Sequence, residues 1–173
     1  MIITQEKLKK LSKDGLRIAL GFGCFDILHV GHIRFINKIK KNSSKAVAIG
    51  VTDDSLVRYL KGEGRPINTQ NFRLEVIANL KAVKYAFIID DIGDFEYYKQ
   101  KYSLINEDQE IWKKLVHCIN GIRPHDFFYS SDFVMTQNIL SALKNYTTVV
   151  HDPIPYVEGI STSKIISQMK NER

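Results

Sequence analysis

The sequence predicts an α/β protein built on a parallel five-stranded sheet with helices on both faces. Short, continuously apolar runs alternate along the chain with segments whose apolar residues recur at helical spacing. Such runs are typical of strands that are buried on both faces of a parallel sheet. The 173 residues suffice for one sizeable core, and no linker rich in Pro, Gly or Ser divides them. We therefore expect residues 1–173 to form a single domain.

Five apolar runs supply the predicted strands. They are 17–22 (RIALGF), 45–51 (KAVAIGV), 85–89 (YAFII), 126–129 (DFFY) and 147–150 (TTVV). Ligands of such sheets bind beyond the carboxyl ends of the strands, where the strand order switches. The residues that follow the first strand are therefore the first place to look for a site.

Apolar stripes and turn residues predict the helices and loops. Isoleucines and a valine three residues apart indicate a helix over 30–41. The other helices are expected over 4–13, 69–82, 134–144 and 162–170. Residues 94–119 have a helical pattern, either throughout or as two helices. Residues 58–68, punctuated by Gly62 and Gly64, are expected to form a loop.

The net charge of +6 favours a polyanionic partner, which would be nucleic acid, an anionic membrane or a phosphorylated small molecule. Residues 1–45 carry ten basic and three acidic side chains, whereas the rest of the chain is nearly balanced. Solvated helix faces are the ordinary explanation for most of these lysines. No nucleic-acid module with interleaved aromatic residues is visible, so nucleic acid is not expected as a partner.

The expected compartment is the cytoplasm. No apolar run approaches the roughly 20 residues that a transmembrane helix needs, so no membrane partner is expected. Cys24 and Cys118 cannot build a disulfide framework, which indicates a reducing environment.

Residues 21–32 (GFGCFDILHVGH) follow the first strand and admit two interpretations. A dinucleotide fingerprint fails because Asp26 occupies the position of the third glycine. The alternative rests on His29, Gly31 and His32 at the start of a helix, where unpaired N–H groups attract phosphate. Two imidazoles on the first turn, with a glycine between them, suit a triphosphate chain. Zinc is the other ligand considered, but no cysteine or carboxylate completes a set by spacing.

These residues resemble the nucleotide-binding motif of the cytidylyltransferase-like nucleotidyltransferases. Two further segments support the resemblance. Residues 159–165 (GISTSKI) resemble the family's Ile-Ser-Thr-Thr element, whose hydroxyls cap the last helix and can donate to phosphate. Residues 60–66 (LKGEGRP) resemble a loop of the adenylyltransferase domain that makes ADP-heptose. After the fourth strand, where relatives have a Gly-rich segment ending in Asp, this chain has Tyr-Ser-Ser and then Asp132.

The resemblance implies a Rossmann-like nucleotidyltransferase domain that transfers a nucleoside monophosphate to a phosphorylated small acceptor, such as a sugar phosphate, and releases pyrophosphate. It implies Mg²⁺ as cofactor, with no protein cluster of metal ligands. The catalytic residues would be His29, His32, Lys61 and Arg65. The nucleotide would contact Gly23, Cys24, Phe25, Gly31, Ser161, Thr162 and Ser163. The acceptor substrate would contact Asp26, Arg73 and Asp132.

Three points stay open in the sequence. The nucleotide is either ATP or CTP, and the alternative acceptor for a cytidylyltransferase is glycerol 3-phosphate or another phospho-alcohol. A nucleotide-binding regulator without turnover is the alternative from a different class. A homodimer is also left open.

Overall fold

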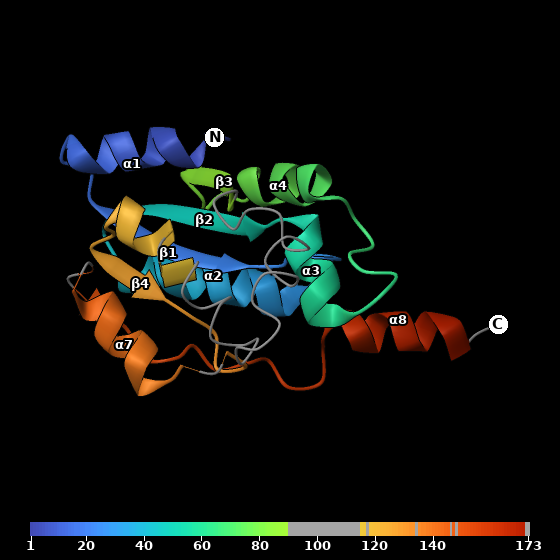
Figure 1. Ribbon diagram of the computed structural model, residues 1–173. Helices are drawn as coiled ribbons and strands as arrows, with labels where there is room; N and C mark the ends of the chain where they lie inside the picture. The colour runs from blue at the N-terminus through green and yellow to red at the C-terminus, as the bar shows by residue number, and fades with distance from the viewer. Residues whose placement is uncertain (90–114, 117, 134, 146, 148, 172–173) are drawn as a thin grey trace, which may run out of the picture.

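The computed structural model describes residues 1–89, 115–116, 118–133, 135–145, 147 and 149–171. Within these residues it confirms the predicted fold class, a parallel five-stranded sheet with the order β3-β2-β1-β4-β5 (Figure 1). The strands are β1 (Ile18–Gly23), β2 (Ala46–Thr52), β3 (Tyr85–Ile89), β4 (Asp126–Phe128) and β5 (Val149–Val150). The strand order switches between β1 and β4, which are neighbours in the sheet.

The helices mostly fall where the apolar stripes predict them. They are α1 (Gln5–Lys13), α2 (Val30–Asn42), α3 (Asp54–Lys61), α4 (Gln70–Ala78), α7 (Gln137–Lys144) and α8 (Thr162–Asn171). Residues 115–116 and 118–122 are helical as well. A helical pattern is predicted for residues 94–119. Residues 94–114 and 117 of this segment lie outside the described residues, and the others are helical.

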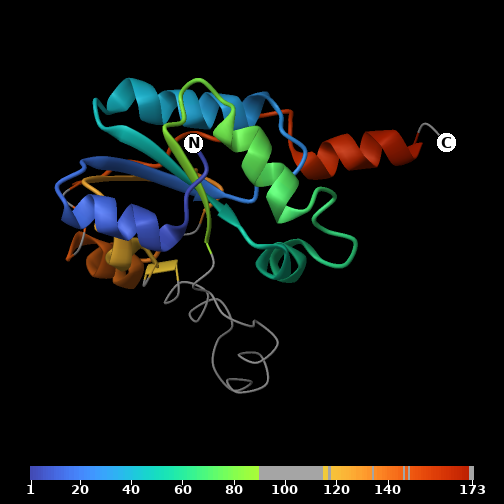
Figure 2. The same cartoon turned by 90° about the horizontal axis from the view of Figure 1, so that it is seen from above.

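The two faces of the sheet carry separate apolar clusters. Phe35, Ile36 and Ile39 of α2 pack with Leu74 and Ile77 of α4 on one face. The other face is covered by α1, α3, α7 and the helical residues 118–122. Figure 2 shows α2 and α4 on one side of the strands and α1 and α7 on the other. The sheet is therefore buried on both sides, as its continuously apolar strands require.

Helix α3 corrects the predicted loop over 58–68, because the first residues of that segment are helical. The side chain of Asp53 caps α3 by accepting a hydrogen bond from the N–H of Leu56 at 3.0 Å. Gly62, with φ +89°, ends the helix. The sequence concealed α3 because the helix is short and only Leu56 and Val57 are buried.

Glycine in β1 sets how closely α2 approaches the sheet. A Cβ atom built on Gly21 would lie 2.5 Å from Cδ1 of Ile39 and 3.2 Å from Cε1 of Phe35. Both contacts belong to the inner face of α2, so a side chain at this position would push the helix away. The position of the α2 N-terminus, and of everything built on it, depends on this absent side chain.

We predict that Gly21→Ala destabilises the fold by about 1–3 kcal/mol, because the new methyl group overpacks the contact with α2. The Ile39→Val substitution removes the Cδ1 atom that the methyl group would meet. In the Ile39→Val background, Gly21→Ala should therefore cost about 1 kcal/mol less. Urea unfolding of the four proteins of this cycle measures the coupling, and strictly additive effects would contradict the contact.

Candidate active site

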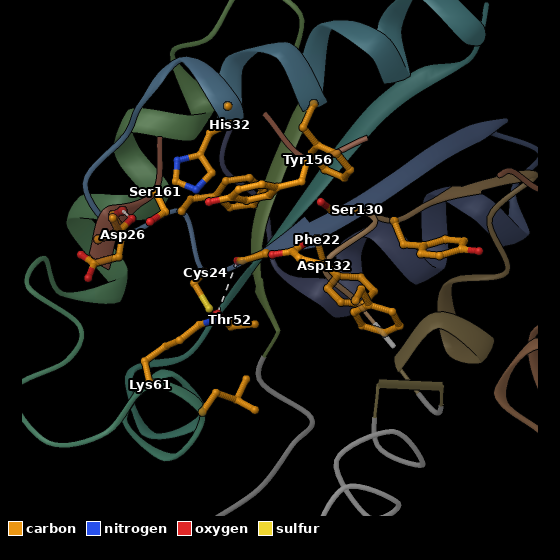
Figure 3. A pocket seen from close by; sticks show the side chains of 18 of the residues that line it. Phe22, Cys24, Asp26, His32, Thr52, Lys61, Ser130, Asp132, Tyr156 and Ser161 are labelled. Atoms are coloured by element: carbon orange, nitrogen blue, oxygen red, sulfur yellow. Dashed lines mark hydrogen bonds between the residues drawn. The ribbon is translucent and has the colours of Figure 1, made fainter. Parts of the chain in front are cut away.

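A cavity of about 840 Å³ opens beyond the carboxyl ends of the strands, next to the switch between β1 and β4. This volume suits a small-molecule ligand. Its lining includes thirteen of the fourteen residues that the sequence singles out. They are Gly23, Cys24, Phe25, Asp26, His29, Gly31, His32, Lys61, Arg65, Asp132, Ser161, Thr162 and Ser163. Figure 3 shows His32, Lys61, Asp132 and Ser161 arranged around this space.

Two stacked imidazoles form the start of α2. His29 is the N-cap residue, and its Nδ1 accepts a hydrogen bond from the N–H of Gly31 at 3.2 Å. His32 reciprocates, with its Nδ1 accepting from the N–H of His29 at 3.4 Å. The ring centroids lie 3.8 Å apart. Backbone N–H groups thus occupy both Nδ1 atoms.

The hydrogen bonds fix the protonation of the pair. An Nδ1 atom that accepts a hydrogen bond carries no proton, so each neutral ring carries its proton on Nε2. Burial, together with the neighbouring His29, lowers the pKa of His32 to about 4. Burial also lowers the pKa of His29. At neutral pH both side chains are therefore neutral Nε2–H donors.

Gly31 and Phe25 hold this pair in place. A Cβ atom on Gly31 would lie 2.9 Å from Cε1 of the His29 ring, so the glycine makes room for the ring to fold back over the helix. The buried ring of Phe25 packs edge-on against His32, with centroids 5.3 Å apart. The same ring lies 3.2 Å from a Cβ atom built on Gly23. Both glycines therefore serve the placement of side chains as well as the approach of a ligand.

Asp26, which is predicted to contact the acceptor, has a buried carboxylate that already accepts hydrogen bonds from the protein. One oxygen accepts from Nε of Arg65 and from the N–H of Ile67, both at 2.9 Å. The other oxygen accepts from the N–H of Asn68 at 3.0 Å. Burial raises the pKa of this carboxyl, but these hydrogen bonds outweigh the effect and hold the pKa below its ordinary value. Asp26 thus organises the segment 65–68.

Arg73 is the one predicted site residue that the structure does not bring to the cavity. It is 2 % exposed, and the cavity lining does not include it. Its three guanidinium nitrogens donate to Asn68 O, Cys24 O and an Asp54 carboxylate oxygen at 2.9, 2.6 and 2.7 Å. These contacts make Arg73 an anchor between helices α3 and α4 and the turn after β1.

The hydroxyl residues at the start of α8 are Ser161, Thr162 and Ser163, and they differ in their hydrogen bonds. Thr162 is buried and donates its hydroxyl to the backbone carbonyl of Asp26, so that hydroxyl is not available to a phosphate. Ser161 caps the helix by accepting from the N–H of Lys164 at 3.1 Å. The hydroxyl protons of Ser161 and Ser163 remain for a ligand.

The segment 58–68, which the sequence predicts as a loop, contributes two cations that are held differently. Lys61 is the last residue of α3, and Figure 3 shows its side chain extending towards Cys24 and Thr52. Nε of Arg65 forms an ion pair with Asp26. This ion pair fixes the orientation of the two terminal guanidinium nitrogens. Neither cation depends on a loop closure to line the cavity.

The sequence missed the apolar half of the cavity. Phe22 packs against Phe133, with ring centroids 5.7 Å apart, and Tyr129 lies 5.8 Å from the same ring. Leu56, Leu60, Leu115, Val116 and Ile139 continue this wall. Residues of this kind at the ends of strands are indistinguishable from core residues in a sequence. The switch between β1 and β4 is the signal that could have marked Phe22 and Tyr129.

The described residues contain no group of three or more His, Cys, Asp and Glu side chains that could hold a metal ion. The acidic residues that line the cavity are Asp26, which is engaged, and Asp132, whose side chain is exposed. A Mg²⁺ ion held mainly by phosphate oxygens and water needs few protein ligands, and Asp132 suits that role. In the part of the chain that the structure describes, no helix is long and apolar enough to cross a membrane.

The sequence matches the cytidylyltransferase-like family model over residues 20–168. The bifunctional protein HldE of Nitratiruptor sp. is 42 % identical over 163 residues, and that of Wolinella succinogenes is 37 % identical over 173 residues. These matches cover 94 % and 98 % of the chain but only 30 % and 31 % of the relatives. The chain thus spans under a third of their length.

Two solved structures share the fold. A lipopolysaccharide core biosynthesis protein from Thermoplasma volcanium has a TM-score of 0.56 at 23 % identity, covering 83 % of this chain and 98 % of its own. Pantothenate synthetase from Thermus thermophilus has a TM-score of 0.66 at 11 % identity, covering 98 % and 70 %. At these identities the likeness concerns the fold alone.

We predict that Asp26→Asn destabilises the protein by about 3 kcal/mol, since the amide cannot accept all three hydrogen bonds and leaves Arg65 unpaired in a buried site. Asp132→Asn is the matched control in the same cavity. Its side chain is exposed, so its effect should stay within about 0.5 kcal/mol. Chemical denaturation measures both values, and equal effects would contradict the role of Asp26.

The lowered pKa of His32 predicts a pH dependence of stability. In the unfolded chain, His32 binds a proton below its ordinary pKa of 6.5. In the folded protein the same side chain binds a proton only near pH 4. The free energy of unfolding should therefore fall from pH 6.5 towards pH 4, with His32 contributing about 1 kcal/mol per pH unit. His32→Asn keeps an acceptor for the N–H of His29 but cannot titrate. Its stability curve should be flatter over this window, and an unchanged slope would refute the assignment.

Proposed function

The chain belongs to the cytidylyltransferase-like family, and from this premise we propose that it transfers AMP from ATP to a sugar phosphate and releases pyrophosphate. The observation that carries the proposal is the pair of neutral imidazoles at the α2 N-terminus, facing the cavity at the switch point of the sheet. The matching relatives and the geometry of the cavity both support nucleotidyl transfer. ATP and the sugar phosphate are the finer part of the proposal.

Phosphate binding follows from the donors that face the cavity. The N-terminus of a helix carries partial positive charge, and Nε2–H of His29 and of His32 adds two directed donors. The Ser161 and Ser163 hydroxyls lie at a second helix N-terminus, that of α8. A triphosphate chain would thus lie between the first turns of α2 and α8.

The rate enhancement would come from donors placed where negative charge develops. The acceptor phosphate is already anionic, so its attack on the α-phosphorus needs no general base. The histidine Nε2–H groups would hydrogen-bond oxygens of the α-phosphate while the bond to the attacking oxygen forms. Lys61 and Arg65 would neutralise the departing pyrophosphate from the other wall. Because the imidazoles start neutral, they donate without repelling the cations.

Asp132 would hold Mg²⁺, and the ion would supply neutralisation of the phosphate charge. The residues that fix the position of the phosphates remain those of α2, α3 and α8.

The choice of ATP and a sugar phosphate rests on two features. Residues 60–66 resemble the loop of the adenylyltransferase domain that makes ADP-heptose, and the matching relatives are named HldE. The substrates would share the cavity, with the sugar in the half that Phe22, Tyr129 and Phe133 line.

A substrate panel tests the proposal. Purified protein with Mg²⁺ is incubated with ATP, CTP, GTP or UTP, each with sugar phosphates, glycerol 3-phosphate or phosphocholine. We expect pyrophosphate only when ATP and a sugar phosphate are both present. Release with CTP and glycerol 3-phosphate would replace the proposed substrates but not the reaction. Tight nucleotide binding without pyrophosphate from any pair would refute the transfer.

Substitution of His32 separates chemistry from folding. His32→Asn retains the Nδ1-like acceptor for the helix cap but lacks the Nε2–H donor. We expect kcat to fall about 100-fold or more, the usual cost of losing one such donor, while the fold persists. His125→Asn, outside the cavity lining, is the control and should leave kcat unchanged. Equal activity of the two variants would exclude His32 from the chemistry.

A further inference from the structure

A row of cations marks the edge of the sheet where the strands begin. Lys84, Lys45 and Arg17 directly precede β3, β2 and β1, which are neighbours in the sheet. Adjacent strands of a sheet lie about 5 Å apart, so the backbones of neighbouring residues in the row are separated by about that distance. Backbone hydrogen bonds at this edge, from Ala46 N to Arg17 O at 3.0 Å and from Lys84 N to Val47 O at 2.9 Å, hold it in register.

The last helical turns and the connections at the same edge carry more cations. We define the basic edge as Lys13, Arg17, Lys41, Lys45, Lys81, Lys84, Arg123 and Lys144. All but Lys45 are exposed. The hydroxyl of Ser12 donates to Arg123 O at 3.4 Å and the N-terminal ammonium donates to Lys84 O at 3.1 Å, which bring further segments to this edge.

Few carboxylates oppose this charge. In the described last helical turns and connections at this edge, the exposed carboxylates are Asp14 and Glu75. Asp126 is buried and accepts from Lys45 at 2.6 Å. The basic edge therefore presents a strong positive field to solvent.

Helix ends explain only part of the pattern. Lysines in the last turn of a helix interact favourably with its dipole, which accounts for Lys13, Lys41 and Lys144. Arg17, Lys81 and Lys84 lie beyond the ends of α1 and α4, so the helix dipole does not require them. These three exposed cations are placed to attract an external anion.

We propose that the basic edge is a docking surface for a bilayer that contains anionic phospholipids. Clustered lysines and arginines bind such surfaces electrostatically without inserting. The cavity lies at the opposite edge of the sheet and its lining includes none of these cations, so docking would leave it open to solvent. This proposal is independent of the transfer reaction.

Other partners fit the basic edge less well. Among the described residues near this edge, the exposed large apolar side chains are Met1, Ile2 and Val149, and none of the exposed side chains there is an aromatic ring that could stack on single-stranded nucleic acid. A protein interface needs an apolar centre. Here the exposed apolar residues are divided, because Ile2 pairs with β3 and Val149 belongs to β5, at opposite ends of the strand order. A second copy of the chain would meet like charge. The sequence excluded a membrane partner because it lacks an apolar span, which has no bearing on a charged face.

The test is sedimentation of the full chain with vesicles. We expect binding to vesicles of phosphatidylglycerol and phosphatidylcholine at about 50 mM salt, none to pure phosphatidylcholine, and release at about 0.5 M salt, where charges are screened. The variant R17Q/K81Q/K84Q should bind about 100-fold more weakly. The control R34Q/R58Q/K7Q removes the same charge from exposed positions outside the basic edge and should stay within a few-fold of the parent protein.

Three results would overturn the proposal. They are failure to bind the anionic vesicles, equal loss of binding in both triple variants, and preferential binding of duplex DNA or RNA over the vesicles at equal phosphate concentration. Pyrophosphate release should be the same with and without vesicles, and inhibition would show that the cavity edge faces the lipid. Circular dichroism of both variants confirms that each is folded before the comparison.

Discussion

The hydrogen bonds of Asp26 hold the site together. The carboxylate fixes the segment 65–68, while the backbone carbonyl of the same residue accepts from Thr162 at the start of α8. Three segments that are remote in the sequence therefore meet at one residue. The ion pair with Arg65 is buried, so its geometry is set by the fold and not by solvent. The cavity has its shape because these segments cannot move independently.

The histidine pair shows how a backbone decides the chemistry of side chains. The first turn of α2 has N–H groups without helical partners, and two imidazoles satisfy two of them. This use of Nδ1 leaves Nε2 as the free atom on each ring and keeps its proton there. The stacked rings also disfavour a second positive charge. Nδ1 of each ring thus caps the helix, and Nε2–H of each ring is left to donate a hydrogen bond to a ligand.

The sequence predicts the sheet and the neighbourhood of the site because both depend on local patterns. Apolar runs mark the strands, and the motif around His29 and His32 follows the first of them. The division of labour between Arg65 and Arg73 could not be predicted, since both follow the same glycine-rich segment. Burial separates them: Arg73 is 2 % exposed and fully engaged, whereas Arg65 reaches the cavity. The sequence also did not predict the apolar wall that includes Phe22 and Phe133, because only the tertiary fold distinguishes a cavity wall from a core.

The ring of His29 lies where a side chain of residue 31 would be, and this has an evolutionary consequence. Any larger residue at 31 would displace the imidazole, since even a Cβ atom would lie within 2.9 Å of it. Loss of His29 would in turn free space and remove the reason for the glycine. Positions 29 and 31 are therefore expected to change together in evolution. A homologue that lacks the histidine at position 29 would tolerate a larger residue at position 31. Descendants that no longer bind phosphate should show this as paired change at positions 29 and 31.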